Sequence, residues 1–437
     1  MNDIAGIPYV AAEFDKSGQL VHPVTIPSGV TDVIVVSHGW NNSRQDAEAL
    51  YARLFANFAA VAQPNDLANR NVAIVGVIWP SKRFDELVSA TATSAAAGGS
   101  ASLSPQASAE SDRLLHEKLD RMAETFTEAG EQKTIAELKA LIPDLQDKGS
   151  ARTAFVDKVR SLLDMSAQND EDASVTFFAD DGNAIMKRLT VDEDDLDASV
   201  AGDGGSASLP LGVGLVKPAT GGAAGGILGF LSGIKSAAMN VLNFATYYEM
   251  KARAGSVGKN GVGPLIDTLA ANVQGIHLVG HSFGGRVVTS TAANSKTDKI
   301  KSMSLLQTAF SHNGFSQSMK GFFRGVVDKN RVNGPILVTH SQKDKAVGVA
   351  YPLASRLSGD VSAALGDKND KFGGLGRNGA QQMMPGEVVE GKLLVAGSSY
   401  QFQPGKFFNL ESSEYIDDHS AVTGKEVAHL IRRAIAG

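Results

Sequence analysis

The segment that most constrains the fold is residues 276–285, Ile-His-Leu-Val-Gly-His-Ser-Phe-Gly-Gly. Its first four residues form a short β-type run, and residues 285–293 can open a helix, so the pattern predicts a strand, a sharp turn and a helix. Gly280 and Gly284 flank Ser282 at the spacing that lets strand and helix pass close together. On such a turn a histidine can take the proton of the serine hydroxyl, which is otherwise a weak nucleophile. The segment predicts a nucleophilic Ser282, and the competing interpretation is a structural turn with an incidental serine.

The segments around this one predict an α/β fold with a mostly parallel sheet. Residues 32–37 are a continuous β-branched run, typical of a strand that is buried on both faces. A capping-box pattern at Ser43 and Asp46 begins a helix over about 44–62, and the next strand follows it, which makes a βαβ unit. The remaining predicted elements are a hairpin over 8–22, strands at 71–79, 302–307, 335–340 and 407–411, a helix over 264–273, and a C-terminal helix.

The pattern changes between the two parts that carry these strands. We therefore divide the chain into a first part of the sheet domain at 1–85, an insertion at 86–244, and a second part at 245–437. The insertion begins with a Ser- and Ala-rich stretch. It continues with helical stripes, one of which is Leu115, Leu119, Met122 and Phe126. These features predict a mainly helical cap or lid.

Residues 222–246 belong to the least polar part of the chain. Six glycines and Pro218 interrupt the stretch between Lys217 and Lys235, so a transmembrane span is not expected. The alternatives are a mobile lid or amphipathic helix over a substrate entrance, with contact to a membrane surface, and a helix buried in the protein. Only a comparison of binding to liposomes with and without this stretch separates them.

Composition narrows the classes of partner and cofactor. The net charge is −6 and the isoelectric point is about 5.9, which argues against nucleic acid as the main partner. The chain has no cysteine, which excludes disulfides, thiolate chemistry and cysteine-ligated metal. The acidic clusters between 168 and 205 lack EF-hand spacing and are interpreted as a solvated loop. The N-terminus lacks the pattern of a secretory signal, so a cytoplasmic protein is expected, although export without such a signal stays open.

A nucleophilic serine needs a histidine and a carboxylate that holds the histidine in the correct tautomer. In known hydrolases that carry the serine on such a strand-to-helix turn, the acid and then the histidine follow it in the sequence, each on a loop after a strand. Asp344 follows a predicted strand, whereas Asp328 lies at the wrong end of that strand. His419 lies between the last predicted strand and the C-terminal helix. The neighbouring Asp417 and Asp418 are alternatives to Asp344 as the partner of His419.

The same chemistry needs two backbone N–H groups that point at the developing oxyanion. The first is the N–H of Phe283, directly after the serine. The second is expected in the loop that follows the first buried strand, where Trp40 is the choice. His38, Gly39 and His281 are interpreted as turn and packing residues that support these motifs.

These residues resemble the α/β-hydrolase superfamily. The motifs His38-Gly39-Trp40-Asn41 and Trp79-Pro80-Ser81 are similar to those of a group of bacterial lipase-like hydrolases. The resemblance covers about 1–85 and 245–437 and rests on His38-Gly39-Trp40-Asn41, Ile78-Trp79-Pro80-Ser81, Gly280-His281-Ser282-Phe283-Gly284-Gly285, Asp344 and His419. It implies an eight-stranded, mostly parallel sheet and no metal or organic cofactor. It also implies hydrolysis of a small-molecule or lipid ester through an acyl-enzyme, and it says nothing about the insertion.

Three classes of function remain at this stage, of which the ester hydrolase is the first. The same residues would serve a thioesterase, amidase or acyltransferase, because a fold does not choose among these reactions. A third class is a binding protein that keeps this fold while the insertion contacts the partner. Reaction of Ser282 with an organophosphorus probe discriminates the enzymes from the binding protein.

Overall fold

The computed structural model describes residues 2–81, 105–165, 168–169, 171–190, 233–344 and 370–437, together with residues 346, 357 and 368. It divides the chain into two compact units. The first unit consists of Met1–Lys82, Met250–Pro352 and Ala364–Gly437, and the second consists of Arg83–Glu249 and Leu353–Ala363. Most of the predicted Ser- and Ala-rich stretch, and residues 222–232 of the predicted membrane-contact segment, lie outside the described residues.

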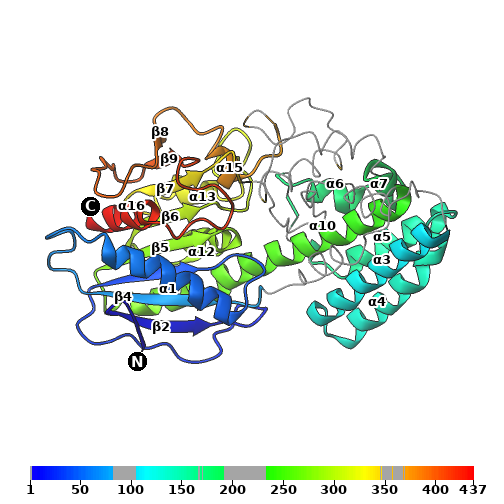
Figure 1. The fold of residues 1–437 in the computed structure, drawn as a ribbon, viewed down its shortest axis with the longest axis horizontal. Helices are drawn as coiled ribbons and strands as arrows, with labels where there is room; N and C mark the ends of the chain where they lie inside the picture. The colour runs from blue at the N-terminus through cyan, green and yellow to red at the C-terminus, as the bar shows by residue number, and fades with distance from the viewer. Residues whose placement is uncertain are drawn as a thin grey trace, which may run out of the picture. The chain divides into compact units, whose positions relative to one another are not determined.

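The first unit is built on a nine-stranded sheet with the order β1-β2-β4-β3-β5-β6-β7-β9-β8 (Figure 1). All neighbouring strands run parallel except β1 and β2. The expected α/β class with a mostly parallel sheet is confirmed, and the expected strand number of eight is one too low. The strands are β1 (Asn2–Ile4), β2 (Ile7–Glu13), β3 (Asp32–Ser37), β4 (Val72–Ile78), β5 (Gly275–His281), β6 (Ile300–Leu306), β7 (Ile336–His340), β8 (Val388–Lys392) and β9 (Phe407–Glu411).

The hairpin expected over 8–22 forms only at its turn, and the second strand expected there is absent from the described elements. β2 pairs with β4 along one edge, and its first three residues pair with β1 on the other edge. The carboxylate of Asp15 accepts hydrogen bonds from the backbone N–H groups of Ser17 and Gln19 and closes the expected turn. After this turn Leu20 forms an isolated antiparallel bridge with Phe14, and the N–H of Val21 donates to the carbonyl of Glu13 at 2.8 Å.

Helices cover both faces of the sheet (Figure 1). On one face α1 (Arg44–Ala60) packs on β4 and on α16 (Lys425–Ala436), and α1 begins at the predicted capping box of Ser43 and Asp46. On the other face α12 (Phe283–Asn294) packs on β3, β5 and β6. The π-helical turn η3 (Val257–Val262) and the helices α11 (Gly263–Leu269), α13 (Arg324–Asp328) and α15 (Leu375–Asn378) complete the unit.

The second unit is helical in its described part, as predicted. Its helices are α3 (Pro105–Thr125), α4 (Ala129–Leu141), η1 (Ile142–Asp144), α5 (Gly149–Ser161), α6 (Ser174–Ala179), α7 (Gly182–Arg188) and most of α10 (Gly233–Ser256). The predicted stripe on α3 is buried, and α3 packs on α4. The side chains of residues 235–246 on α10 are buried as well.

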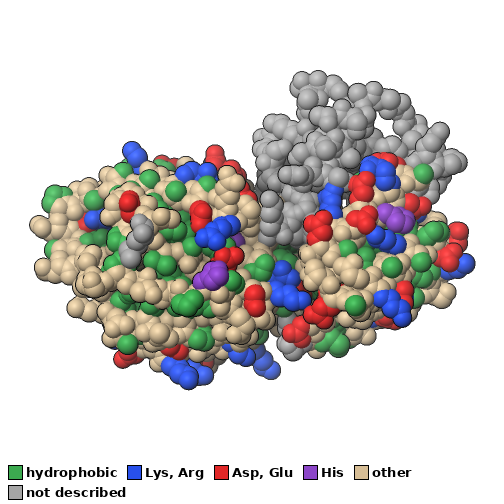
Figure 2. All heavy atoms as spheres, turned by 90° about the horizontal axis from the view of Figure 1, so that it is seen from below, with side chains coloured by type: hydrophobic (Ala, Val, Ile, Leu, Met, Phe, Trp, Pro, Cys, Tyr) green, Lys and Arg blue, Asp and Glu red, His purple; other side chains and the backbone are tan. Residues whose placement is uncertain are grey.

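The hydropathy of the helices and the charges on the surface agree with what the composition predicts. None of the helices in the described part of the chain combines the length and the hydropathy that a membrane span requires. On the face shown in Figure 2, acidic and basic side chains are interspersed over both units.

Candidate functional site

Ser282 lies on the sharp turn that the sequence predicts. β5 ends at His281 and α12 begins at Phe283, so Ser282 alone connects strand and helix, with φ 56° and ψ −125°. This left-handed conformation is strained for a residue with a side chain. The two flanking glycines are required because a Cβ atom on Gly280 would lie 2.4 Å from the carbonyl oxygen of Gly284, and one on Gly284 would lie 2.1 Å from that of Ser37.

Ser282, His419 and Asp344 form a continuous chain of hydrogen bonds. The hydroxyl of Ser282 is 2.8 Å from Nε2 of His419, and Nδ1 of His419 is 2.9 Å from Oδ2 of Asp344. Asp344 is fully buried, whereas the His419 side chain is 15% exposed. With its proton on Nδ1, the imidazole donates to the carboxylate and leaves Nε2 free to accept the serine proton. The structure thus brings together three residues that lie 62 and 75 positions apart in the sequence.

The alternative acids lie elsewhere. Asp417 and Asp418 are both exposed, and Oδ1 of Asp418 accepts a hydrogen bond from the backbone N–H of Ser420. Asp328 ends α13 and pairs with Arg324 at 2.8 Å. Among the four candidate carboxylates, the structure therefore places Asp344 at hydrogen-bond distance from His419.

The loop after β3 is fixed from within by His38. Its buried ring donates from Nδ1 to the carbonyl of Gly39 at 2.8 Å and accepts the N–H of Trp79 at Nε2 at 3.3 Å. The ring also stacks on that of Trp79, with centroids 5.5 Å apart. Gly39 brings the loop against the serine, since a Cβ atom there would lie 2.6 Å from Cβ of Ser282. The His-Gly pair is thus explained by close packing, as expected.

Trp40 and Phe283, the expected oxyanion donors, lie side by side. Their rings meet edge to face with centroids 5.6 Å apart. Phe283 is the first residue of α12, where backbone N–H groups point out of the helix. Asn42, which the sequence did not single out, donates from Nδ2 to the carbonyls of Gly39 and Trp40 at 3.2 and 2.9 Å. These carbonyls are therefore held by Asn42, which fixes the peptide planes of the loop beside the serine.

His281 has a second role that the sequence did not reveal. Its Nε2 lies 2.8 Å from the carbonyl oxygen of His419, so the ring carries its proton on Nε2 and donates it. Burial, and next the neighbouring His419, lower the pKa of His281 to about 3. The ring centroids of the two histidines are 5.0 Å apart. His281 thus holds the backbone of His419 while remaining neutral.

Acid destabilisation is expected from the two buried histidines of the site. Burial lowers the pKa of His38 to about 4 and that of His281 to about 3, against an ordinary 6.5. Between pH 6.5 and about 4 the unfolded chain therefore binds more protons at these residues than the folded chain does. Each such proton lowers the free energy of unfolding by up to about 1.4 kcal/mol per pH unit as the pH falls. We expect a decline approaching about 3 kcal/mol per pH unit in this window.

Urea titrations at pH 7, 6 and 5 measure this decline. The matched variant is His281→Gln, whose amide can keep the bond to the His419 carbonyl and does not titrate. Its slope should be smaller than that of wild type by the contribution of one histidine, up to about 1.4 kcal/mol per pH unit. Equal slopes for variant and wild type would contradict the explanation.

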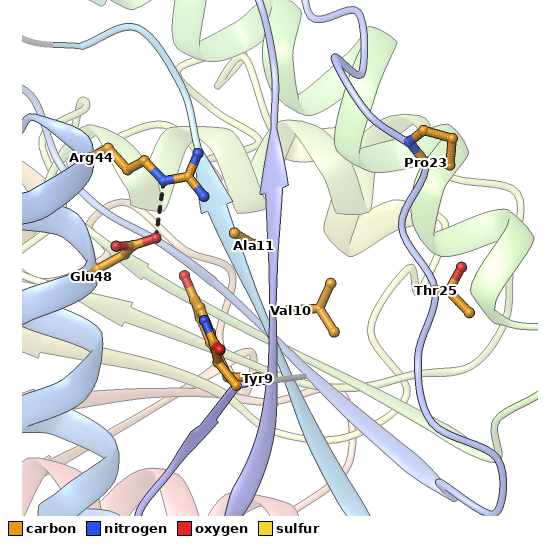
Figure 3. A pocket seen from close by; sticks show the side chains of 8 residues that line it. Tyr9, Val10, Ala11, Pro23, Thr25, Arg44 and Glu48 are labelled. Atoms are coloured by element: carbon orange, nitrogen blue, oxygen red, sulfur yellow. Dashed lines mark hydrogen bonds and ion pairs between the residues drawn. The ribbon is translucent and has the colours of Figure 1, made fainter.

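A pocket of ≈ 480 Å³ lies apart from these residues, beside β2 (Figure 3). The ion pair of Arg44 and Glu48 from α1 lies on one side of β2, and Pro23 and Thr25 lie on the other. The residues that line it are Asn2, Tyr9, Val10, Ala11, Pro23, Thr25, Arg44 and Glu48, none of which is a predicted site residue.

Within the described ranges, no group of three or more His, Asp or Glu side chains is placed to hold a metal ion. No protein-family model matches the chain, and neither a curated protein nor a solved structure is detectably similar to it. A function for this chain must therefore be argued from the geometry of the site.

Proposed function

We propose that the chain is a serine hydrolase with an α/β-hydrolase fold that cleaves carboxylic esters through an acyl-enzyme. The observation that carries this proposal is the hydrogen-bonded chain of Ser282, His419 and Asp344. Their loops follow β5, β9 and β7, so the three residues lie at the carboxyl edge of a parallel sheet, where ligands bind in open α/β proteins.

In the proposed mechanism the Ser282 oxygen attacks the ester carbonyl while its proton passes to Nε2 of His419. Asp344 accepts the Nδ1 proton in a hydrogen bond and stabilises the imidazolium. The N–H groups of Phe283 and Trp40 bind the oxyanion of the tetrahedral intermediate. The tetrahedral intermediate then collapses, and the imidazolium protonates the departing alkoxide. The alcohol is released, and the acyl group stays on Ser282 as the acyl-enzyme. In the second half of the reaction, His419 takes a proton from water, and the water oxygen attacks the acyl carbonyl. The carboxylic acid is released, and the proton returns to Ser282.

The choice of an ester with an apolar acyl chain is supported by the surroundings of the serine. Phe283 directly follows the serine, and its ring meets that of Trp40 edge to face, so the residues next to the serine in sequence and in the β3 loop are aromatic. Most of the second unit, Arg83–Glu249, is encoded between two parts of the first, as caps and lids of such enzymes are.

Labelling with a fluorophosphonate probe tests the proposal. We expect one equivalent of probe in the intact mass, located at Ser282 by peptide mapping, and none in heat-denatured protein. Hydrolysis of p-nitrophenyl esters of two to twelve acyl carbons then gives the preferred chain length. Labelling without ester turnover would favour a thioester or amide substrate. Absence of labelling, or labelling at another residue, would contradict the proposal.

A further inference from the structure

Gln307 comes directly after the strand that lies between the strands leading to Ser282 and Asp344. It follows β6, which pairs with β5 on one side and β7 on the other. Its side chain is fully buried, and Nε2 lies 3.2 Å from Oδ2 of Asp344 and 2.8 Å from the carbonyl oxygen of Gly376. The amide thus connects the acid of the site to a neighbouring loop.

Chemistry fixes the orientation of this amide. A carboxylate and a peptide carbonyl only accept hydrogen bonds, so the group that faces both must be the NH₂ with its two hydrogens. The opposite orientation would place the amide oxygen against two acceptors. In the observed orientation Oε1 is buried and has no hydrogen-bond partner among the described residues. Gln307 therefore satisfies Asp344 and Gly376 at the expense of its own oxygen.

The backbone of Gln307 is held as tightly as its side chain. Its φ is 43°, in the left-handed region that residues with side chains rarely adopt. The N–H donates to Oγ1 of Thr339 on β7 at 3.3 Å. Gly376 packs directly on it, since a Cβ atom there would lie 2.4 Å from the carbonyl carbon of Gln307. Both the strained φ and the unsatisfied Oε1 are unfavourable for folding. An apolar side chain of similar length would fill the same space without burying an unsatisfied oxygen.

We propose that Gln307 is a positioning residue for the acid, an inference that rests on the proposed hydrolase function. The same oxygen, Oδ2 of Asp344, accepts hydrogen bonds from His419 Nδ1 and from Gln307 Nε2. The second donor prevents the carboxylate from rotating away from the imidazole. Gln307 acts through Asp344 and touches neither the serine nor the imidazole in any contact that the described residues show.

The variant Gln307→Met removes the donor and keeps the length of the side chain. We expect kcat for the best p-nitrophenyl ester to fall about 10- to 100-fold, which is the range for losing a hydrogen bond to a charged group, with KM within twofold. The control is Thr308→Val, which changes the adjacent, fully buried residue, whose hydroxyl has no partner among the described residues. It should keep the wild-type kcat.

A readout without substrate separates this inference from the proposed function. The hydrogen-bonded Nδ1 proton of His419 should give a downfield proton resonance, assigned by its loss in His419→Gln. In Gln307→Met it should broaden or vanish through exchange with water, and in Thr308→Val it should persist. If wild type neither labels nor hydrolyses esters while the resonance behaves this way, the hydrolase proposal fails and the positioning role stands.

Two outcomes overturn the positioning role. One is a Gln307→Met protein with wild-type kcat, and the other is an unchanged resonance in that protein. If Gln307→Met does not unfold cooperatively, Gln307→Glu replaces it, because it keeps the shape and presents only acceptors when ionised. It should lose at least as much kcat, and wild-type activity in this variant counts equally against the inference.

Discussion

The variant Ser282→Ala is expected to lose ester hydrolysis by about 10⁶-fold in kcat and to lose all labelling by a fluorophosphonate. Removal of the serine from other Ser–His–Asp sites has an effect of this size, because no group is left to form the acyl-enzyme. The remaining rate would come from water attacking a carbonyl that is still bound by the oxyanion donors. Titration with the probe and measurement of initial rates at saturating ester give both quantities.

The fold of this variant should be intact. Alanine keeps the left-handed backbone at this turn and removes one hydroxyl that bonds only to the imidazole in the described contacts. The free energy of unfolding should change by about 1 kcal/mol or less. A suitable control is Ser304→Ala, at a buried serine on β6, which should label and turn over as wild type does. Ester turnover that survives in Ser282→Ala would place the nucleophile at another residue.

The central strands could be predicted because they are buried on both faces. Residues 32–37 and 71–79 read as continuous apolar runs, and β3 and β4 lie within them. The strands that were missed lie at the two edges of the sheet. β1 has only three residues, and β8 carries Glu390 and Lys392 with a mostly exposed pattern, so neither has the apolar signal of a buried strand. Edge strands of this kind are identified by the neighbouring strands that they pair with, and this pairing is visible only in the structure.

The three residues of the candidate site could be predicted because parallel strands end at the same edge of a sheet. A residue just after one strand therefore meets a residue just after another, and this geometry predicts Asp344 and His419. The same argument does not rank Asp344 against Asp417 and Asp418, which precede His419 directly. That choice depends on where a side chain points, and the distance of 2.9 Å decides it.

The residues that hold the site could not be predicted, since their roles depend on contacts between distant segments. Gln307 meets Asp344 across 37 positions, and His281 meets the backbone of His419 across 138. Neither belongs to a pattern that encodes such a contact. Asn42 is adjacent to the recognised loop motif, yet nothing in the motif shows that its amide holds two carbonyls.

The variant Asp344→Ala should lower kcat about 10⁴-fold. Without the carboxylate the imidazole no longer has an acceptor for its Nδ1 proton, so the tautomer with a free Nε2 loses its advantage. The imidazolium that forms when Ser282 attacks also loses its counter-charge. In a comparable site, removal of the acid alone has an effect of about this size. KM should change little, because Asp344 is fully buried and reaches the ester only through His419.

The neighbouring acids supply the matched controls. Asp417→Ala should keep kcat within about twofold, because the exposed carboxylate makes no described contact with the imidazole. Asp418→Ala removes the hydrogen bond to the N–H of Ser420, so a loss of about 10-fold at most is expected from loosening of the loop. If Asp344→Ala were active and Asp417→Ala or Asp418→Ala inactive, the acid would be local to His419. The buried chain of hydrogen bonds would then be structural, and the serine would depend on an imidazole oriented from its own loop.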